Sequence, residues 1–242
     1  MAAPAPPDPL FRTAEVAARL LCRWHRAELD GAARVPDGPA LLVGNHGLFG
    51  LETPVFLWLL RRATGRTPWA LADRALLGGP LARPFRRWVR SVPRTFGNAR
   101  RLLADGHLLV SYPGGARETF KGPHDRHRVR WERSLSFARL AIAAQVPVVP
   151  FAGLGVDDGF VNLGRVRAAR ALLGRRASPL ALGVGPLPWP ARLHFVLGRP
   201  IAPPADPSGA ALLRAAAERA VLTLLASHGT HAVPARPAAV VP

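Results

Sequence analysis

A histidine and a glutamate that lie close together in the sequence form the first candidate for chemistry. His46 directly follows the apolar run Ala40–Gly44, and Glu52 comes six positions later, after Gly47 and Gly50. A carboxylate bound to one imidazole nitrogen fixes the tautomer and leaves the other nitrogen as a base. The two glycines permit a tight turn that folds Glu52 back toward His46. The spacing therefore predicts a general base that deprotonates a hydroxyl group as its oxygen attacks a carbonyl carbon.

A plainer interpretation of the same residues stays open at this point. His46 could merely end the strand, and Glu52 could stabilise the N-terminus of the next helix, where negative side chains are favoured. The motif alone does not separate the two interpretations.

A second apolar run, residues 107–112, ends in Pro113-Gly-Gly-Ala-Arg-Glu118. Backbone N–H groups in a Gly-rich turn can bind an anion, and Arg117 can bind one through two hydrogen bonds. An ordinary strand-to-loop turn has a similar composition. The segment between the two motifs is basic and could hold a phosphate, contact a membrane or simply be solvated. Its arginines are Arg83, Arg86, Arg87, Arg90, Arg94, Arg100 and Arg101.

Short apolar runs alternate along the chain with amphipathic helical patterns. This alternation predicts an α/β fold with a mostly parallel sheet flanked by helices. Both motifs then follow the carboxyl ends of strands, the edge at which open α/β sheets bind ligands. The expected strands are 40–44, 69–72, one beginning near 92, 107–112, 146–151 and 192–197. The expected helices are 52–63, 80–90, 98–105, 131–145, 165–176 and 207–227.

The chain is expected to form one domain with loose ends. Residues 1–9 are expected to be a disordered lead, and residues 10–30 are expected to form one amphipathic helix with arginines on one face. Residues 31–227 are expected to form the folded domain, and residues 228–242 a disordered tail. The N-terminal helix could lie on a membrane surface or pack on the sheet.

The charge balance is strongly basic. The 33 basic residues against 15 acidic ones give a formal charge of +18, and Lys121 is the only lysine. A genome rich in G and C explains arginine in place of lysine, but not the scarcity of acids. Such a surface attracts anionic lipids, phosphorylated substrates or nucleic acid. With no secretory signal pattern, no apolar run of about 18 residues and only Cys22 as a thiol, we expect a peripheral protein at the cytoplasmic face of an anionic membrane.

The order and spacing of the motifs resemble the glycerolipid acyltransferase family, which includes the lysophosphatidic acid acyltransferases. The first block of that family is His, four spacers and Asp, where this chain has five residues between His46 and Glu52. The third block is Phe-Pro-Glu-Gly-Thr-Arg, where this chain has Tyr112-Pro-Gly-Gly-Ala-Arg117. Both departures resemble the branch nearer the diacylglycerol and monoacylglycerol acyltransferases. The likeness runs from about residue 40 to residue 200.

The resemblance makes residues 31–227 an acyltransferase domain and implies a role for each matched residue. His46 is the base and Glu52 its partner. Arg117 lies near the acceptor headgroup, and Gly114 and Gly115 shape that end of the site. Two further substrate-side residues are carried over from the second and third blocks. They are Arg94 and Glu118, the latter in place of the acid that Gly114 replaces.

The predicted reaction moves a fatty acyl group from acyl-CoA or an acyl carrier protein to a hydroxyl of a lysophospholipid or a mono- or diacylglycerol. No acyl-enzyme, cofactor or metal is expected, and backbone N–H groups around Gly47 are the expected oxyanion donors. The alternative is a basic protein that binds lipid or nucleic acid without catalysis. Since the chain has no recognisable nucleic-acid-binding motif, a nucleic acid partner is not expected.

Overall fold

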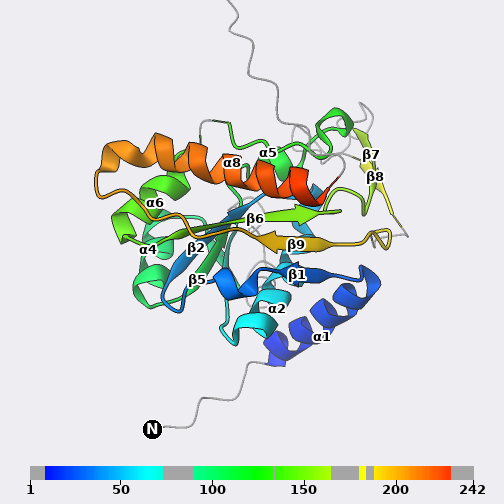
Figure 1. Cartoon of the computed structure of the whole chain (residues 1–242). Coiled ribbons are helices and arrows are strands. Elements are labelled where there is room, and N and C mark those ends of the chain that lie inside the picture. Colours follow the sequence, from blue (N-terminus) through cyan, green and yellow to red (C-terminus); the bar gives the residue numbers. More distant parts are fainter. Residues whose placement is uncertain (1–8, 73–89, 133, 165–179, 184–187, 230–242) are drawn as a thin grey trace, which may run out of the picture.

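A computed structural model describes residues 9–72, 90–132, 134–164, 180–183 and 188–229 (Figure 1). Its α-helices are α1 (Pro9–Trp24), α2 (Glu52–Thr64), α4 (Phe96–Ala104), α5 (Ala116–Thr119), α6 (Ser136–Ala144) and α8 (Ala210–His228). Its strands are β1 (Glu28–Asp30), β2 (Ala40–Gly44), β3 (Trp69–Ala72), β4 (Ser91–Pro93), β5 (Leu108–Ser111), β6 (Val148–Leu154), β7 (Val161–Gly164), β8 (Leu180–Leu182) and β9 (His194–Leu197). The predicted lead, most of the tail and the helices expected at 80–90 and 165–176 lie largely outside the described residues.

Seven strands form one sheet in the order β1-β9-β6-β2-β5-β3-β4. The five strands from β6 to β4 are parallel, whereas β9 is antiparallel to β6 and β1 is parallel to β9. The prediction of a mostly parallel sheet is therefore confirmed. A second, two-stranded sheet pairs β7 with β8.

Helices cover both faces of the large sheet (Figure 1). In β2, Leu41 and Val43 pack with α4, α6 and α8, whereas Ala40 and Leu42 face the layer that contains α1 and α2. Successive side chains of a strand point to opposite faces, so a strand covered on both sides is apolar throughout. This explains the continuous apolar run that precedes His46.

The N-terminal helix is shorter than predicted. The expectation of one helix over residues 10–30 is wrong, because α1 ends at Trp24 and residues 28–30 form β1. The chain turns at Arg26, whose φ is +44°, and β1 then pairs with the edge of β9. Pairing satisfies backbone groups that a sheet edge would otherwise expose.

The helix predicted over residues 131–145 also begins later, at Ser136. Trp131 is fully buried and lies edge-on to Phe137, with 5.5 Å between ring centroids. A buried aromatic residue in an irregular segment gives the same apolar signal as one on a helix. The sequence pattern therefore placed the start of this helix too early. At the C-terminal side, α8 follows a 3₁₀ turn at Pro207–Gly209 and includes His228, which the sequence placed in the tail.

Three neighbouring parallel strands end at the same edge of the sheet. Asn45 and His46 follow β2, Tyr112 follows β5, and Asp157 follows β6. Segments more than 100 residues apart in the sequence are joined there: the Asn45 side chain donates to the Gly153 carbonyl and accepts from the Gly153 N–H, each at 2.8 Å. This edge therefore collects side chains from both predicted motifs and from a third segment.

Candidate active site

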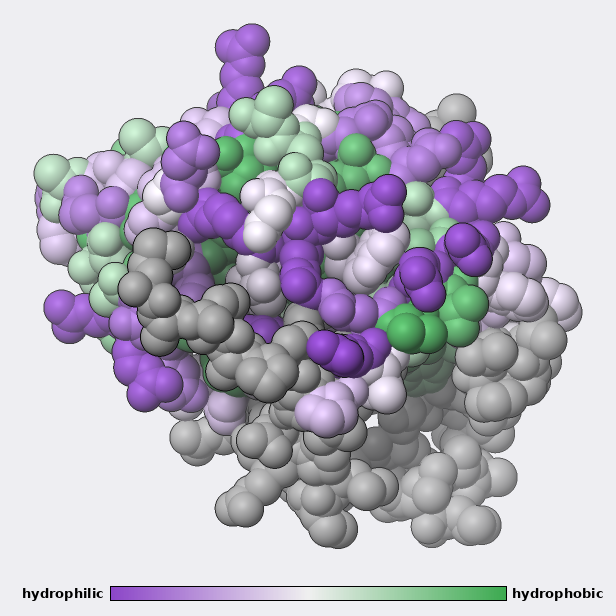
Figure 2. All heavy atoms as spheres, turned by 90° about the horizontal axis from the view of Figure 1, so that it is seen from below, coloured by the Kyte–Doolittle hydropathy of each residue, from purple (hydrophilic) through white to green (hydrophobic). Residues whose placement is uncertain are grey.

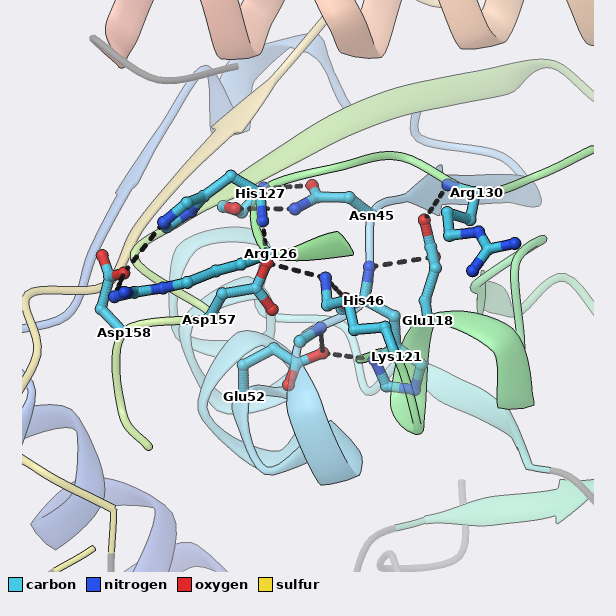
Figure 3. Close-up of polar contacts among 12 residues, drawn as sticks. Asn45, His46, Glu52, Glu118, Lys121, Arg126, His127, Arg130, Asp157 and Asp158 are labelled. Carbon is cyan, nitrogen blue, oxygen red and sulfur yellow. Dashed lines mark hydrogen bonds and ion pairs between the residues drawn. The ribbon is translucent and has the colours of Figure 1, made fainter. Parts of the chain in front are cut away.

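The turn after β2 brings the His46 and Glu52 side chains into contact (Figure 3). His46 Nδ1 is hydrogen-bonded to Oε1 of Glu52, the first residue of α2. The Gly47 N–H donates to the same oxygen at 3.1 Å. The side chains of His46 and Glu52 are 11% and 3% exposed. The spacing predicted this juxtaposition, and Nε2 is the ring nitrogen that Glu52 does not bind.

The charge state of Glu52 follows from its partners. Burial by itself raises the pKa of the Glu52 carboxyl, but the His46 charge and the hydrogen bonds from His46 and Gly47 outweigh it and hold the pKa below its ordinary value. An ionised carboxylate only accepts hydrogen bonds, so Nδ1 of His46 carries the hydrogen. Whenever the ring is neutral, Nε2 is then the proton acceptor that a general base requires.

The geometry of this turn depends on both of its glycines. A Cβ at Gly47 would lie 2.3 Å from the Val156 carbonyl oxygen. A side chain at Gly50 would place its Cβ 2.7 Å from Cε1 of His46, and Gly50 itself has a φ of +68°. The turn therefore leaves room for the imidazole only because this position lacks a side chain. The Gly47 N–H already donates to Glu52, so this one N–H of the turn is not available to an oxyanion.

Tyr112 supports the imidazole from a side that the motif analysis missed. Its ring stacks on His46 with 3.9 Å between centroids and an interplanar angle of 8°. Burial, together with the charge of Glu52, raises the pKa of the Tyr112 hydroxyl well above its ordinary value, so the phenol stays neutral. Thr53 donates to the Tyr112 oxygen at 3.2 Å. Tyr112 is the only tyrosine in the chain, and this was the one available signal.

Glu118 lies behind His46 and is fully buried. Its two carboxylate oxygens accept from the His46 N–H at 3.2 Å and the Arg130 N–H at 2.8 Å. The expectation that Glu118 contacts substrate does not fit this placement, because the side chain is enclosed and binds main-chain groups. Burial is the main reason that the pKa of the Glu118 carboxyl is raised to about 7.

The other predicted substrate-side residues lie at the turn after β5. Gly114 leaves room for Glu118, since a Cβ there would lie 2.4 Å from Cδ of that side chain. Gly115 faces the Arg94 guanidinium, since a Cβ at this position would lie 3.1 Å from Nη1 of Arg94. Arg117 on α5 is 58% exposed and pairs with Glu132, with 3.0 Å between Nε and Oε2. The fold thus brings Arg94 and Arg117 to the same Gly-rich turn.

A buried ion pair beside His46 was not predicted. Lys121 Nζ donates to the His46 carbonyl at 3.0 Å and lies 2.7 Å from Oδ2 of Asp157. The same Oδ2 accepts from the His127 N–H at 2.7 Å. The sequence indicated a polar loop over residues 121–130, which accounts for its composition but not for the burial of Lys121. Within the described residues, no group of three or more His, Cys, Asp or Glu side chains could hold a metal ion.

Comparison with known proteins connects this geometry to a family. The model of the family described as Acyltransferase matches residues 26–153. The human DGAT1/2-independent enzyme synthesizing storage lipids is 31% identical over 185 residues, covering 76% of this chain and 56% of that protein. Phytyl ester synthase 1, chloroplastic, from Arabidopsis thaliana is 30% identical over 137 residues, covering 54% of this chain and 20% of that protein. The chain thus spans little more than half the length of the human relative.

A solved structure agrees at the level of the fold. The 1-acyl-sn-glycerophosphate (LPA) acyltransferase PlsC from Thermotoga maritima matches with a TM-score of 0.61 at 18% identity, covering 90% of this chain and 79% of that one. The family model covers more than half of the chain and includes both sequence motifs. The resemblance that the motifs predicted is therefore confirmed: the chain belongs to the acyltransferase family.

Proposed function

We propose that this protein transfers a fatty acyl group from an acyl thioester to a hydroxyl of a glycerolipid. The observation that carries the proposal is the buried His46–Glu52 pair, with Nδ1 engaged and Nε2 left as the base. In this reaction Nε2 takes the hydroxyl proton, and the alkoxide oxygen bonds to the thioester carbonyl carbon. The C–S bond then breaks, and the leaving thiolate takes the proton from the imidazolium. Proton transfer of this kind contributes about 10²–10⁴-fold to the rate.

The relatives support a lipid acceptor without a phosphate. Two of them are named for the synthesis of storage lipids and of phytyl esters. This chain also has Gly114 where the phosphate-accepting branch has an acid. We therefore favour a mono- or diacylglycerol over a lysophospholipid as the acceptor.

An apolar groove between α1 and α2 offers a place for the acyl chain. It lies beside the first turn of α2, which carries Glu52. Its apolar lining is Ala14, Ala18, Pro54, Leu57, Trp58 and Pro68, and the paired Glu15 and Arg61 side chains lie beside them. An acyl chain in such a groove exchanges water for apolar surface, worth about 0.8 kcal/mol for each buried CH₂ group.

The outer face of α1 favours attachment to an anionic membrane. Val16, Leu20 and Trp24, spaced four residues apart, are exposed on one stripe, whereas Ala14 and Ala18 are buried. Viewed from this side, apolar patches lie among hydrophilic side chains (Figure 2). Next to the stripe, four arginines, one acid (Glu28) and Trp58 line an open hollow that is basic on balance. These arginines are Arg19, Arg23, Arg26 and Arg62.

Apolar side chains beside basic ones are typical of helices that lie in a membrane surface. No helix in the described part of the chain is long and apolar enough to span a bilayer. Peripheral attachment through α1 is therefore part of the proposal.

Purified protein incubated with radiolabelled acyl-CoA or acyl carrier protein tests the reaction. The acceptor panel contains monoacylglycerol, diacylglycerol, a lysophospholipid and a long-chain alcohol, each presented in vesicles. We expect a labelled ester with an acylglycerol acceptor. Release of free fatty acid alone, or no turnover with any pair of substrates, would contradict the proposal.

Flotation with phosphatidylglycerol vesicles tests the attachment. The double variant Val16→Ser, Leu20→Ser is expected to lose most of its binding. Leu212 on α8 is 77% exposed, and Leu212→Ser is the matched control. Equal loss of binding in both would show that the stripe on α1 has no special role.

A further inference from the structure

We propose that Lys121 and Asp157 are positioning residues for His46, acting through its main chain and not through its ring. This inference rests on the proposed function for its kinetic consequence, although its structural consequence can be measured without substrate. The three segments concerned follow β2, α5 and β6, and they meet at one point of the sheet edge (Figure 3).

The ion pair is enclosed and directed at the peptide group of His46. The Lys121 and Asp157 side chains are 2% and 5% exposed. Lys121 Nζ donates to the His46 carbonyl at 3.0 Å, and Asp157 Oδ2 lies 2.7 Å from Nζ. Because Oδ2 also accepts the His127 N–H, Asp157 ties the loop after α5 to the same point. The other carboxylate oxygen of Asp157 is buried without a hydrogen bond among the described residues.

Both peptide groups that flank the His46 Cα are thereby held by buried ionisable side chains. The N–H of His46 donates to Glu118, and its carbonyl accepts from Lys121. These two bonds set the direction of the Cα–Cβ bond. That direction decides whether the ring meets Glu52 at Nδ1 and stacks on Tyr112 at the same time. A catalytic base needs this kind of support, because small errors in position cost much of the rate.

The chemistry of the site requires lysine. The chain has one lysine among 33 basic residues, so arginine serves elsewhere. An ammonium group is compact and can place one nitrogen between a carbonyl and a carboxylate oxygen, whereas a guanidinium is planar and larger. In an enclosed site, Lys121→Arg keeps the charge but forces its neighbours apart.

Two variants test the proposal. Lys121→Met with Asp157→Asn removes both charges of the pair together, so neither is left buried without the other, and keeps an acceptor for the His127 N–H. Lys121→Arg keeps the charge and changes the shape. The matched control is Asp158→Asn, which breaks the neighbouring but exposed pair of Asp158 with Arg126.

Two readouts separate positioning from a general loss of stability. Measured well below the melting temperature, kcat should fall by about tenfold to 10²-fold in either variant, with the KM values for donor and acceptor changed by less than about twofold. The proton NMR resonance of the Nδ1–H shared with Glu52, identified by its absence in His46→Ala, should shift or broaden. The Asp158→Asn control should keep both wild-type properties.

A wild-type kcat together with an unchanged Nδ1–H resonance in the folded variants would overturn the inference. Should the double variant fail to fold, Lys121→Arg decides by the same two readouts. If wild-type protein transfers no acyl group, the proposed function fails, and the resonance alone still decides whether Lys121 and Asp157 position His46.

Discussion

The turns that follow β2 and β5 lie next to each other at one edge of the sheet, and their charged side chains differ in burial. In the first, His46 and Glu52 are almost fully buried and bound to each other. In the second, Arg117 is 58% exposed, and its partner Glu132 is 42% exposed. An exposed ion pair contributes about 0–1 kcal/mol, so an incoming ligand can readily replace Glu132. The His46–Glu52 pair is thus fixed when the chain folds, whereas the exposed Arg117 side chain can exchange its partner.

Glu118 belongs to the second turn by sequence and to the first by its contacts. It lies on α5, one residue after Arg117, but is fully buried and binds the His46 N–H. One short helix therefore separates two roles. Arg117 is exposed on it, and Glu118 binds the His46 N–H inside the protein.

The largest expected effect comes from removing the base. His46→Ala should lower kcat by about 10²–10⁴-fold, because the substrate hydroxyl then loses its proton acceptor. The measurement is the initial rate of acyl ester formation, with circular dichroism to show that the variant is folded. Activity within a few-fold of wild type would remove the His46–Glu52 pair from the mechanism.

Glu52→Gln should have the next largest effect, with kcat lowered by about 10²-fold or more. The amide can donate a hydrogen bond to Nδ1, which moves the ring hydrogen to Nε2 and leaves no base there. Since the pKa of Glu52 lies below its ordinary value, wild-type activity should not fall through titration of Glu52 until the pH drops below about 4.5. Glu52→Asp, which keeps the charge, is the control and should retain more activity than the amide.

The sequence predicted the first turn better than its surroundings. The His46–Glu52 contact was one of two interpretations of the local spacing, because the five intervening residues include two glycines that permit a tight turn. The stack of Tyr112 on His46 and the bond from Lys121 depend on which strands are neighbours and how a loop returns, and local patterns do not specify either. Composition still carried a signal, since the only tyrosine and the only lysine both contact His46.

Burial was the other property that the sequence did not predict. Glu118 was expected at the substrate because the family resemblance gave it the role of the acid that Gly114 replaces. Its burial follows from the paired requirements of the His46 and Arg130 N–H groups, which lie on two other segments. The helix expected at 131–145 was predicted to begin too early for a related reason. Trp131 is buried in the core, but it lies in an irregular segment before the helix.

Arg117→Ala should act on substrate binding with a smaller effect. We expect the acceptor KM to rise by about tenfold, the equivalent of one charge-assisted hydrogen bond, while kcat changes little. The rise should be larger for a lysophospholipid than for an acylglycerol, because only the first carries a charged headgroup. Arg219→Ala, at an exposed arginine of α8, is the control. An equal change in KM for both variants would show that general surface charge, and not this turn, attracts the acceptor.

Glu118→Gln should give the smallest effect, on the pH dependence of stability. The pKa of the Glu118 carboxyl is raised from 4.5 to about 7, so between these values the folded protein holds a proton that the unfolded chain has released. Wild-type stability therefore decreases as pH rises through this range and stays reduced above it. Glutamine resembles the protonated acid and does not titrate, so the variant should lack this decrease.

From pH 5 to pH 8, the melting temperature of wild type should thus fall relative to that of Glu118→Gln. A chain of this size changes by about 2–4 °C for each kcal/mol. A difference that stays constant over this range would mean that Glu118 is already ionised in the folded protein near pH 5. His46 would then contact two ionised carboxylates, those of Glu52 and Glu118. Lys121 would have to balance the negative charges of both Glu118 and Asp157. The arrangement of the buried turn around His46 would then depend on that single lysine.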